Sequence, residues 1–228
     1  MNSSGTLRDV WSLVLAGGNG ERLGPLVQRW LGRHKPKQYC TFIGSRSMLQ
    51  HTLDRSDRII AAERRVTIIA RAHAEEAGPH LLSGSPGQVV LQPANRETAA
   101  GIFLGLAQIR AQDPNASVVI FPSDHFIYPE EQFVQAARIL ARAAQQMKHW
   151  IFLLGVAPDR PEPEYGYIQP GPPLGWMACV CEPWSPSWKS RAWNRVKQCM
   201  APASCGIRWL WAAGLTLSGD WAGAVFPR

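Results

Sequence analysis

No stretch of the sequence is apolar for long enough to cross a membrane, and its start, MNSSGTLRDV, lacks a basic segment followed by an apolar one. These absences predict a cytoplasmic protein with no membrane partner. The chain has five cysteines but no CxxC pair, which argues against a zinc site. Without a secretory leader we expect no disulfide framework either. The 228 residues suffice for one large domain with its own core.

Clustered basic runs are also missing. The net charge is +7, but more than half of this excess lies in residues 174–228, and the other cations are scattered singly. Neither a recognition helix nor a stacking platform for bases is evident, so we expect no nucleic-acid partner. The number of subunits is not fixed by the sequence, and a homo-oligomer stays open.

Residues 174–228 differ in composition from the rest of the chain. They hold seven of the ten tryptophans and four of the five cysteines, but only Glu182 and Asp220 as acids. We therefore predict a nucleotide-binding domain over residues 10–173, followed by a Trp- and Cys-rich tail over residues 174–228.

Strand patterns alternate with helical patterns up to about residue 170. The strand patterns are Val10–Ala16, Arg65–Ala70, Gln88–Gln92, Ser117–Phe121 and Trp150–Val156. A helical stripe in Thr98–Arg110 consists of Ala99, Ile102, Phe103, Leu106 and Ile109. Pro129 and two following glutamates are typical of the start of another helix. This alternation predicts an α/β fold with a mostly parallel sheet and helices on both faces.

Polar stretches follow three of these strands. GGNGER comes after the first strand, QPANRET after the third and PSDH after the fourth. Loops at the carboxyl ends of parallel strands share one crevice, which is where ligands bind in open α/β sheets. The three stretches are therefore predicted to converge on a ligand.

The glycine-rich loop has the composition of a phosphate-binding turn. Its glycines allow a tight turn that exposes backbone N–H groups; they are Gly17, Gly18 and Gly20. Arg22 adds a bidentate phosphate partner, and Lys37 in KPKQ adds a further cation. The loop is neither a P-loop, because no Gly-Lys-Ser/Thr follows, nor a dinucleotide fingerprint, because Leu23 replaces the third glycine. The alternative is an ordinary turn with a solvated arginine.

The other two motifs each allow two interpretations. Asp124, directly after a buried strand, can hold Mg²⁺ at substrate phosphates or can cap a turn. In QPANRET, Arg96 and neighbouring amides can read a base edge, or Asn95 and Thr98 can cap the helix. In YGYI, Gly166 can admit a ligand close to the backbone or can belong to an ordinary edge strand.

Five motifs occur in order between about Trp11 and Gly171: LAGGNGERLGPL, KPKQ, QPANRETAAGI, FPSDHF and GVAPDRPEPEYGYIQPG. This ordered set resembles that of the sugar-phosphate nucleotidylyltransferases, and within them most closely the mannose-1-phosphate guanylyltransferases. The resemblance implies a GT-A-like, Rossmann-type mixed sheet. It also implies an enzyme that converts GTP and mannose 1-phosphate into GDP-mannose and pyrophosphate.

The resemblance assigns a role to each motif. It implies that the glycine loop cradles the triphosphate and that Mg²⁺ binds Asp124. The implied catalytic cations are Arg22 and Lys37; the implied nucleoside contacts are Gln92, Asn95, Arg96 and Thr98; the implied sugar contacts are Gly166 and Tyr167. Glu97 and Gly101 depart from the commoner forms of their motif, which leaves another nucleoside triphosphate and sugar 1-phosphate open.

The tail departs from the family pattern. A Glu-Lys-Pro motif, whose lysine meets the sugar phosphate, and then a Trp-Asn motif are expected after YGYIQPG, but the tail has neither in that setting. Read one base back, codons for Val180–Arg195 can encode VRAVESFLEKPSLEQ, and codons for Cys205–Trp211 can encode LWNTLVV. We therefore hypothesise a reading-frame shift near Leu174–Val180 that impairs catalysis. The alternatives are a genuinely divergent tail and a catalytically inactive GTP-binding module.

Overall fold

The computed structural model describes residues 7, 9–82, 87–156, 209–210 and 214–216. The chain divides into two compact units, one of residues 1–153 and 212–228 and one of residues 154–211, which are described separately. The strands of the larger unit are β1 (Val10–Ala16), β2 (Arg65–Ala70), β3 (Gln88–Gln92), β4 (Ser117–Pro122) and β7 (Gly214–Thr216). Its α-helices are α1 (Gly24–Leu31), α2 (Met48–Asp57), α3 (Ala74–Leu81), α4 (Glu97–Gln112) and α5 (Glu130–Gln146). Its 3₁₀ helices are η1 (Glu21–Leu23), η2 (Lys37–Tyr39), η3 (Ala62–Arg64) and η4 (Arg71–His73).

The sheet of this unit has the order β3-β2-β1-β4-β7. The first four strands are parallel to one another, and β7 pairs antiparallel with β4. Leu13 of the central strand β1 lies between Val66 of β2 and Ile120 of β4. The predicted α/β fold with a mostly parallel, mixed sheet is therefore confirmed.

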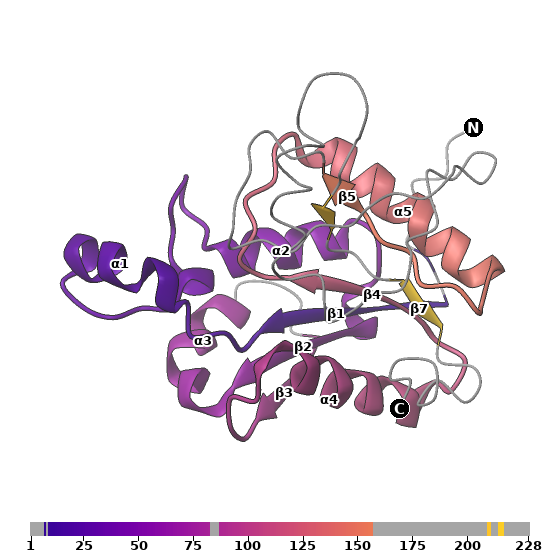
Figure 1. The fold of residues 1–228 in the computed structure, drawn as a ribbon, viewed down its shortest axis with the longest axis horizontal. Helices are drawn as coiled ribbons and strands as arrows, with labels where there is room; N and C mark the ends of the chain where they lie inside the picture. The colour runs from indigo at the N-terminus through magenta and orange to yellow at the C-terminus, as the bar shows by residue number, and fades with distance from the viewer. Residues whose placement is uncertain (1–6, 8, 83–86, 157–208, 211–213, 217–228) are drawn as a thin grey trace, which may run out of the picture. The chain divides into compact units, whose positions relative to one another are not determined.

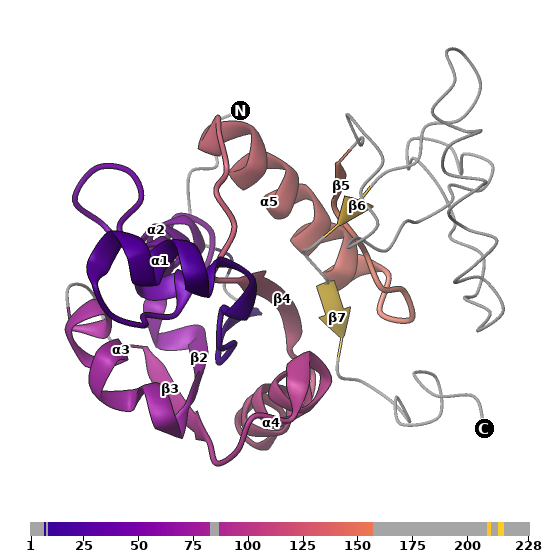
Figure 2. The ribbon, with the colours of Figure 1, turned by 60° about the vertical axis from the view of Figure 1, so that its left-hand side comes forward.

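Helices cover both faces of the sheet (Figures 1 and 2). On one face α4 packs over β1, β2 and β3 through a core cluster of Trp11, Leu13, Val66, Ile68, Leu106, Ile109, Ala116, Val118 and Ile120. On the other face Ser56 of α2 donates a hydrogen bond to Ser12 of β1, and Phe133 of α5 packs on Phe121 of β4. Because successive strand residues point to opposite faces, strands buried on both sides read as the continuous apolar runs seen in the sequence.

Helix α4 reaches the sheet through glycines rather than through the whole predicted stripe. Leu106 and Ile109 are buried as expected, but Ala99 is exposed. A Cβ atom on Gly105 would lie 2.3 Å from Cδ1 of Leu13, and one on Gly101 would lie 3.4 Å from Oε1 of Gln92. The absence of side chains at Gly101 and Gly105 therefore lets the backbone of α4 approach the sheet closely.

The predicted strand Trp150–Val156 is wrong over most of its length. Only Gly155–Val156 forms a strand (β5), which pairs antiparallel with β6 (Trp209–Leu210) in the smaller unit. Phe152 is buried, whereas Ile151 and Leu153 on either side of it are exposed. An apolar run that does not bury both faces lacks the packing that holds a central strand.

The predicted helix start at Pro129 is confirmed. Pro129 is the N-cap of α5, and Glu130 and Glu131 occupy its first turn, where the helix dipole favours acids. Among the helices of the described residues, none combines the length and the apolar composition that a membrane span requires.

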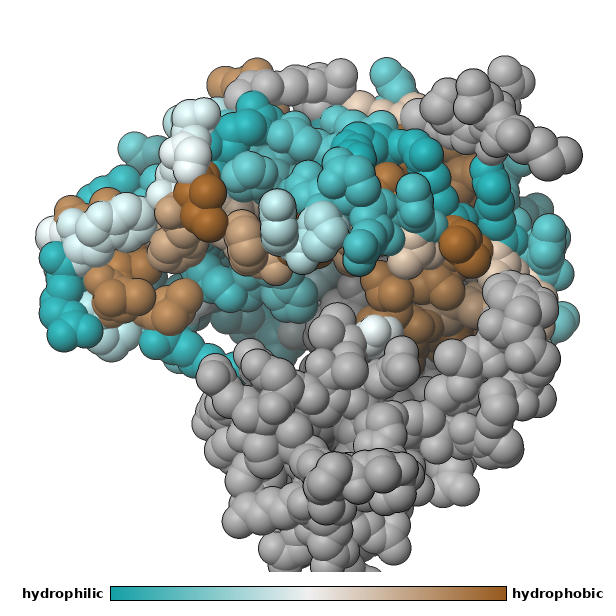
Figure 3. Space-filling view, turned by 90° about the horizontal axis from the view of Figure 1, so that it is seen from above, coloured by the Kyte–Doolittle hydropathy of each residue, from teal (hydrophilic) through white to brown (hydrophobic). Residues whose placement is uncertain are grey.

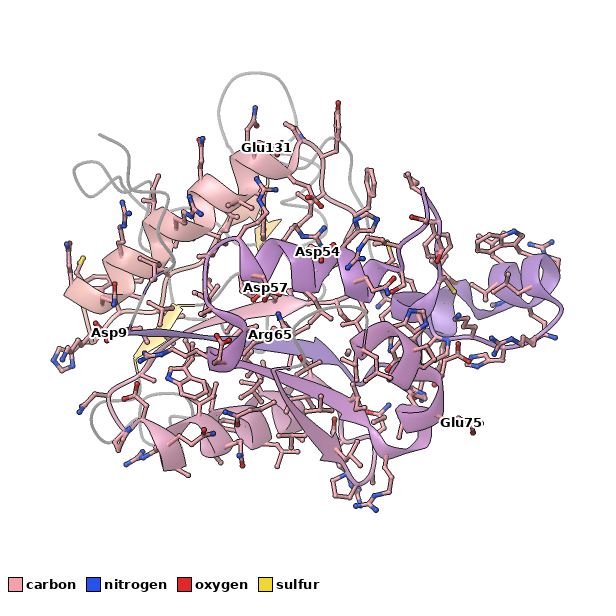
Figure 4. All side chains as sticks on the ribbon, turned by 180° about the vertical axis from the view of Figure 1, so that it is seen from behind. Asp9, Asp54, Asp57, Arg65, Glu75 and Glu131 are labelled. Carbon is pink, nitrogen blue, oxygen red and sulfur yellow. The ribbon has the colours of Figure 1, made fainter. Side chains whose placement is uncertain are left out.

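A buried arginine joins α2 to β2 at the amino-terminal edge of the sheet. Arg65, the first residue of β2, is 2% exposed, and its guanidinium donates a hydrogen bond to the Asp57 carboxylate at the end of α2 (Figure 4). Burial lowers the pKa of Arg65, but an arginine remains charged at any ordinary pH. A nearby carboxylate is therefore needed to offset the cost of burying this charge.

Replacing Asp57 with asparagine is expected to destabilise the fold by about 2–3 kcal/mol, because breaking a buried ion pair strands the remaining charge. The measurement is the free energy of unfolding in urea. The matched control is Asp9→Asn, whose exposed carboxylate lies 3.9 Å from Arg64, so a change under about 0.5 kcal/mol is expected. Equal losses in the two variants would contradict the structural importance of the Arg65–Asp57 pair.

Candidate active site at the carboxyl edge of the sheet

The glycine-rich loop lies directly after β1, between the strand and η1. Gly20, the N-cap of η1, has φ 68°, a left-handed conformation that favours glycine. A Cβ atom at this position would lie 2.8 Å from the backbone nitrogen of Lys37. The loop and the KPKQ segment are therefore in backbone contact, while Arg22 lies on the exposed η1.

Gln38, the last residue of the KPKQ segment, and Tyr39, which follows it, hold the base of the glycine-rich loop. Gln38 donates from Nε2 to the carbonyl oxygens of Ala16 (3.0 Å) and Gly18 (2.7 Å). The Tyr39 hydroxyl donates to the same Ala16 carbonyl at 3.0 Å. Burial raises the pKa of Tyr39 to about 12, so the phenol remains a neutral donor at neutral pH. These three bonds fix the carbonyls of Ala16 and Gly18 at the start of the loop.

Helix α3 fixes the other end of the KPKQ segment. The Glu76 carboxylate pairs with Arg33 at 2.7 Å and with Lys35 at 2.8 Å. These two cations, Arg33 foremost, lower the pKa of Glu76 to about 2. The glutamate is therefore ionised at any physiological pH, and it pairs with both cations.

Asp124 follows β4 and faces the KPKQ segment. Ser123 anchors this turn to β1, since its Oγ and its backbone N–H both donate to the carbonyl of Leu15, at 2.7 and 3.1 Å. The Asp124 carboxylate lies 3.5 Å from Nζ of Lys37, and both side chains are partly exposed. The two residues are thus free to rearrange around a ligand, because an exposed ion pair of this length is weak.

The residues present fit a magnesium ion that arrives with a nucleotide. Within the described parts of the chain, no three His, Cys, Asp or Glu side chains group together as a metal site of their own. Mg²⁺ at substrate phosphates needs only one or two protein carboxylates, because waters and phosphate oxygens complete its shell. Asp124, a single accessible carboxylate beside the KPKQ segment and its glycine-rich loop, meets this requirement.

Gln92, the last residue of β3, points toward the glycine loop. Its side chain is 6% exposed, and a Cβ atom on Gly17 would lie 3.1 Å from its Oε1. Its Nε2 has no hydrogen-bond partner within the described residues. Buried amides are normally satisfied, so this donor is a candidate for a hydrogen bond to a water or to a ligand group.

The QPANRET loop combines a local cap with backbone strain. The Oδ1 atom of Asn95 accepts a hydrogen bond from the backbone N–H of Glu97 at 3.0 Å, so this asparagine does help to cap α4. Arg96 and Thr98 are exposed at the same helix end. Glu97 has φ 64°, the one non-glycine residue with positive φ in the described backbone. Strain of this kind tends to persist at functional sites.

Replacing Glu97 with asparagine is expected to raise stability by about 0.5–1 kcal/mol, because asparagine tolerates the left-handed region better than glutamate does. The corresponding rise in melting temperature is about 2–3 °C. Glu75→Asn, at an exposed first-turn position of α3 with ordinary backbone, is the control and should bring no gain. A comparable gain in both variants would show that backbone strain is not the cause.

An exposed apolar cluster flanks the glycine loop on α1 and the segment after η2 (Figure 3). Its members are Leu26, Trp30, Leu31, Phe42 and Ile43. The rings of Trp30 and Phe42 stack at 5.7 Å. Only Val27 of α1 is buried, so this short helix contributes little to the core. The helix lies beyond the carboxyl end of β1 (Figure 1).

Five of the residues singled out in the sequence are brought together at this edge. Contacts or near contacts join Gly17 to Gln92, Gly20 to Lys37 and Lys37 to Asp124. Gly166 and Tyr167 lie outside the described residues. Sequence reasoning missed the supporting side chains Gln38, Tyr39 and Ser123, and the only signal for them was their place inside or next to the motifs.

Comparisons with known proteins agree with this geometry. Residues 11–175 match the model of the family described as nucleotidyl transferase. The xanthan biosynthesis protein XanB of Xanthomonas campestris pv. campestris (strain B100) is 33% identical over 171 residues, which cover 74% of this chain and 35% of that protein. A mannose-1-phosphate guanylyltransferase of Salmonella montevideo is 34% identical over 170 residues, 72% of this chain and 34% of that protein.

A solved structure extends the likeness to the fold. The Thermus thermophilus protein described as a mannose-1-phosphate geranyltransferase superposes with a TM-score of 0.71 at 26% identity, over 92% of this chain and 58% of that one. This chain spans only about a third of the length of the curated relatives. Since the family match covers well over half of the chain and ends where its composition changes, the chain belongs to the nucleotidyl transferase family.

Proposed function

We propose that the chain binds GTP with Mg²⁺ at the carboxyl edge of the sheet and transfers its guanylyl group to mannose 1-phosphate. The observation that carries this proposal is the meeting of the glycine loop, Lys37 and Asp124 at one edge, with Lys37 3.5 Å from Asp124. A phosphate-binding turn, a cation and a metal-binding carboxylate are the groups that transfer of a nucleotidyl group needs. Relatives named mannose-1-phosphate guanylyltransferase support the choice of substrates.

The proposed reaction needs no covalent intermediate with the protein. An oxygen of the phosphate of mannose 1-phosphate forms a bond to the α-phosphorus of GTP, and the bond from that phosphorus to the bridging oxygen breaks. Pyrophosphate leaves with the bonding electrons, and GDP-mannose remains. When bound, Mg²⁺ would neutralise charge that develops on the leaving pyrophosphate.

The residues of this chain would orient the reactants. Backbone N–H groups of Gly17, Gly18 and Gly20, together with Arg22 and Lys37, would hold the triphosphate, and Asp124 would hold the metal. Gln92 would donate its orphan N–H to the nucleoside, with Asn95, Arg96 and Thr98 nearby. Gly166 and Tyr167 would border the sugar. Charge stabilisation by groups already in position is the main source of rate in such transfers.

A second candidate, a GTP-binding module without turnover, is favoured by one observation. The family match ends at residue 175, and no Glu-Lys-Pro occurs among residues 176–228. If the lysine of that motif is required for the sugar phosphate, the chain binds nucleotide but does not react.

The test is a panel of GTP, ATP, UTP and CTP with Mg²⁺, read by thermal shift and by pyrophosphate release after addition of mannose 1-phosphate. Stabilisation by GTP and release that depends on the sugar phosphate are the results expected for guanylyl transfer. Stabilisation without release would favour the binding module. A preference for another nucleotide would change the substrates, and no response to any nucleotide would refute both functions.

A further inference from the structure

Arg55 on α2 is a buried cation with no role in the proposed chemistry. Its side chain is 2% exposed, although it carries a full charge. Taking an arginine out of water is unfavourable, and here both terminal nitrogens have partners while Nε has none within the described residues. The partners that it binds therefore indicate what it does.

The guanidinium joins α2 to both ends of the segment between β4 and α5. Nη1 donates to Oε1 of Glu130, the first residue of α5, at 2.8 Å. Nη2 donates to the backbone carbonyl of His125 at 3.3 Å and to Oγ1 of Thr52 at 2.7 Å. Thr52 is itself fixed, because its hydroxyl donates to the carbonyl of Met48 at 3.0 Å.

These bonds place an anchor on each side of Asp124. On the amino-terminal side, Ser123 is bound to Leu15 of β1 through two hydrogen bonds. On the carboxyl-terminal side, the carbonyl of His125 is bound to Arg55. The Asp124 carboxylate itself is accessible, and its loose contacts with Nζ of Lys37 at 3.5 Å and Nε2 of His125 at 3.6 Å would not hold it in one position.

We propose that Arg55 is a positioning residue, which holds the backbone at His125 and thereby sets where the Asp124 carboxylate meets the Mg²⁺ of a bound nucleotide. This inference rests on the proposed function. It predicts an effect on the dependence on metal, whereas a residue that only stabilises the fold would not change that dependence.

The neighbouring Arg58 provides a matched control. It binds the same Glu130, at 3.5 Å, and also Glu131, at 3.2 Å, but its side chain is 39% exposed. Its side-chain ion pairs go to these α5 glutamates, whereas Arg55 also binds the carbonyl next to Asp124. Arg58→Met therefore removes an arginine from the same glutamate without releasing His125.

The experiment titrates MgCl₂ at fixed GTP with the full chain and measures nucleotide binding. Arg55→Met is expected to raise the Mg²⁺ concentration for half-maximal binding by about 10-fold or more, as loss of outer support for a metal ligand usually does. Its binding of GTP in EDTA should match that of the wild type. Arg58→Met should leave both quantities unchanged, and Arg55→Lys should recover part of the loss.

Thr52→Val keeps the experiment decisive if Arg55→Met does not fold. It removes one hydrogen bond that orients the guanidinium, so it should shift the Mg²⁺ dependence in the same direction by a smaller factor. Suppose that the wild type binds GTP normally and that a folded Arg55→Met or Thr52→Val variant has the same Mg²⁺ dependence. That result overturns this inference but not the proposed function. A wild-type chain that shows no Mg²⁺-dependent binding of GTP overturns the proposed function and this inference together.

Discussion

A Gly20→Ala variant is expected to lose about 2–5 kcal/mol of stability and at least 10-fold in affinity for GTP with Mg²⁺. The left-handed backbone at Gly20 disfavours any side chain by about 1–2 kcal/mol. In addition, the new methyl group would lie 2.8 Å from the backbone nitrogen of Lys37, and relief of such overpacking costs about 1–3 kcal/mol. The KPKQ segment would have to move, and with it the cation proposed to meet the triphosphate.

Gly18→Ala provides the control for this prediction. Gly18 does not have a positive φ, and nothing lies within 4 Å of a Cβ atom built there. Its stability should therefore stay within about 0.5 kcal/mol of the wild type. Urea unfolding gives the stability of each variant, and GTP titration gives its affinity for the nucleotide. If Gly20→Ala unfolds at the same urea concentration as Gly18→Ala, the close contact with Lys37 does not constrain the loop.

Restoring the adjacent reading frame from about codon 180 onward is expected to produce the largest gain in activity. The restored segment would supply the Glu-Lys-Pro lysine that the resemblance places at the sugar phosphate. We expect pyrophosphate release to rise from a barely measurable rate to an ordinary enzymatic one, about 1–10³ per second. Replacement of the lysine in the restored motif by methionine should remove the gain.

The gene sequence across the codons for Ile168 to Arg228 is the first measurement for this prediction. An open adjacent frame that encodes Glu-Lys-Pro and Trp-Asn in order is the expected result. A frame interrupted by stop codons would refute the frameshift hypothesis and make the Trp-rich segment a genuine part of the protein. Turnover by residues 1–228 at an ordinary rate would also refute the expectation that catalysis is impaired.

Sequence patterns predicted the central part of the fold because buried parallel strands and glycine turns leave strong local signals. The four strands β1 to β4 and the gathering of their following loops needed no knowledge of contacts. The failed strand Trp150–Val156 shows the limit of the method: apolar runs look alike whether or not both faces find partners.

The supporting side chains of the site could not be predicted in the same way. Gln38 binds carbonyls about twenty residues earlier in the chain, and Ser123 binds one more than a hundred residues earlier. Arg55 gives no local signal either, since an arginine on a helix is usually solvated, and its burial follows from the packing of α2 beside α5. Such roles arise from tertiary contacts, which composition and spacing do not encode.

The close approach of α4 to the sheet determines when one side of the site becomes ordered. Since Gly105 leaves no room for even a methyl group beside Leu13, the helix cannot slide along β1 without opening the core. Gln92, whose Oε1 would lie 3.4 Å from a Cβ atom on Gly101 of the same helix, is therefore held in place by the folded protein itself. The entropy of arranging this side chain is lost during folding, so the proposed nucleotide binding need not bear it again.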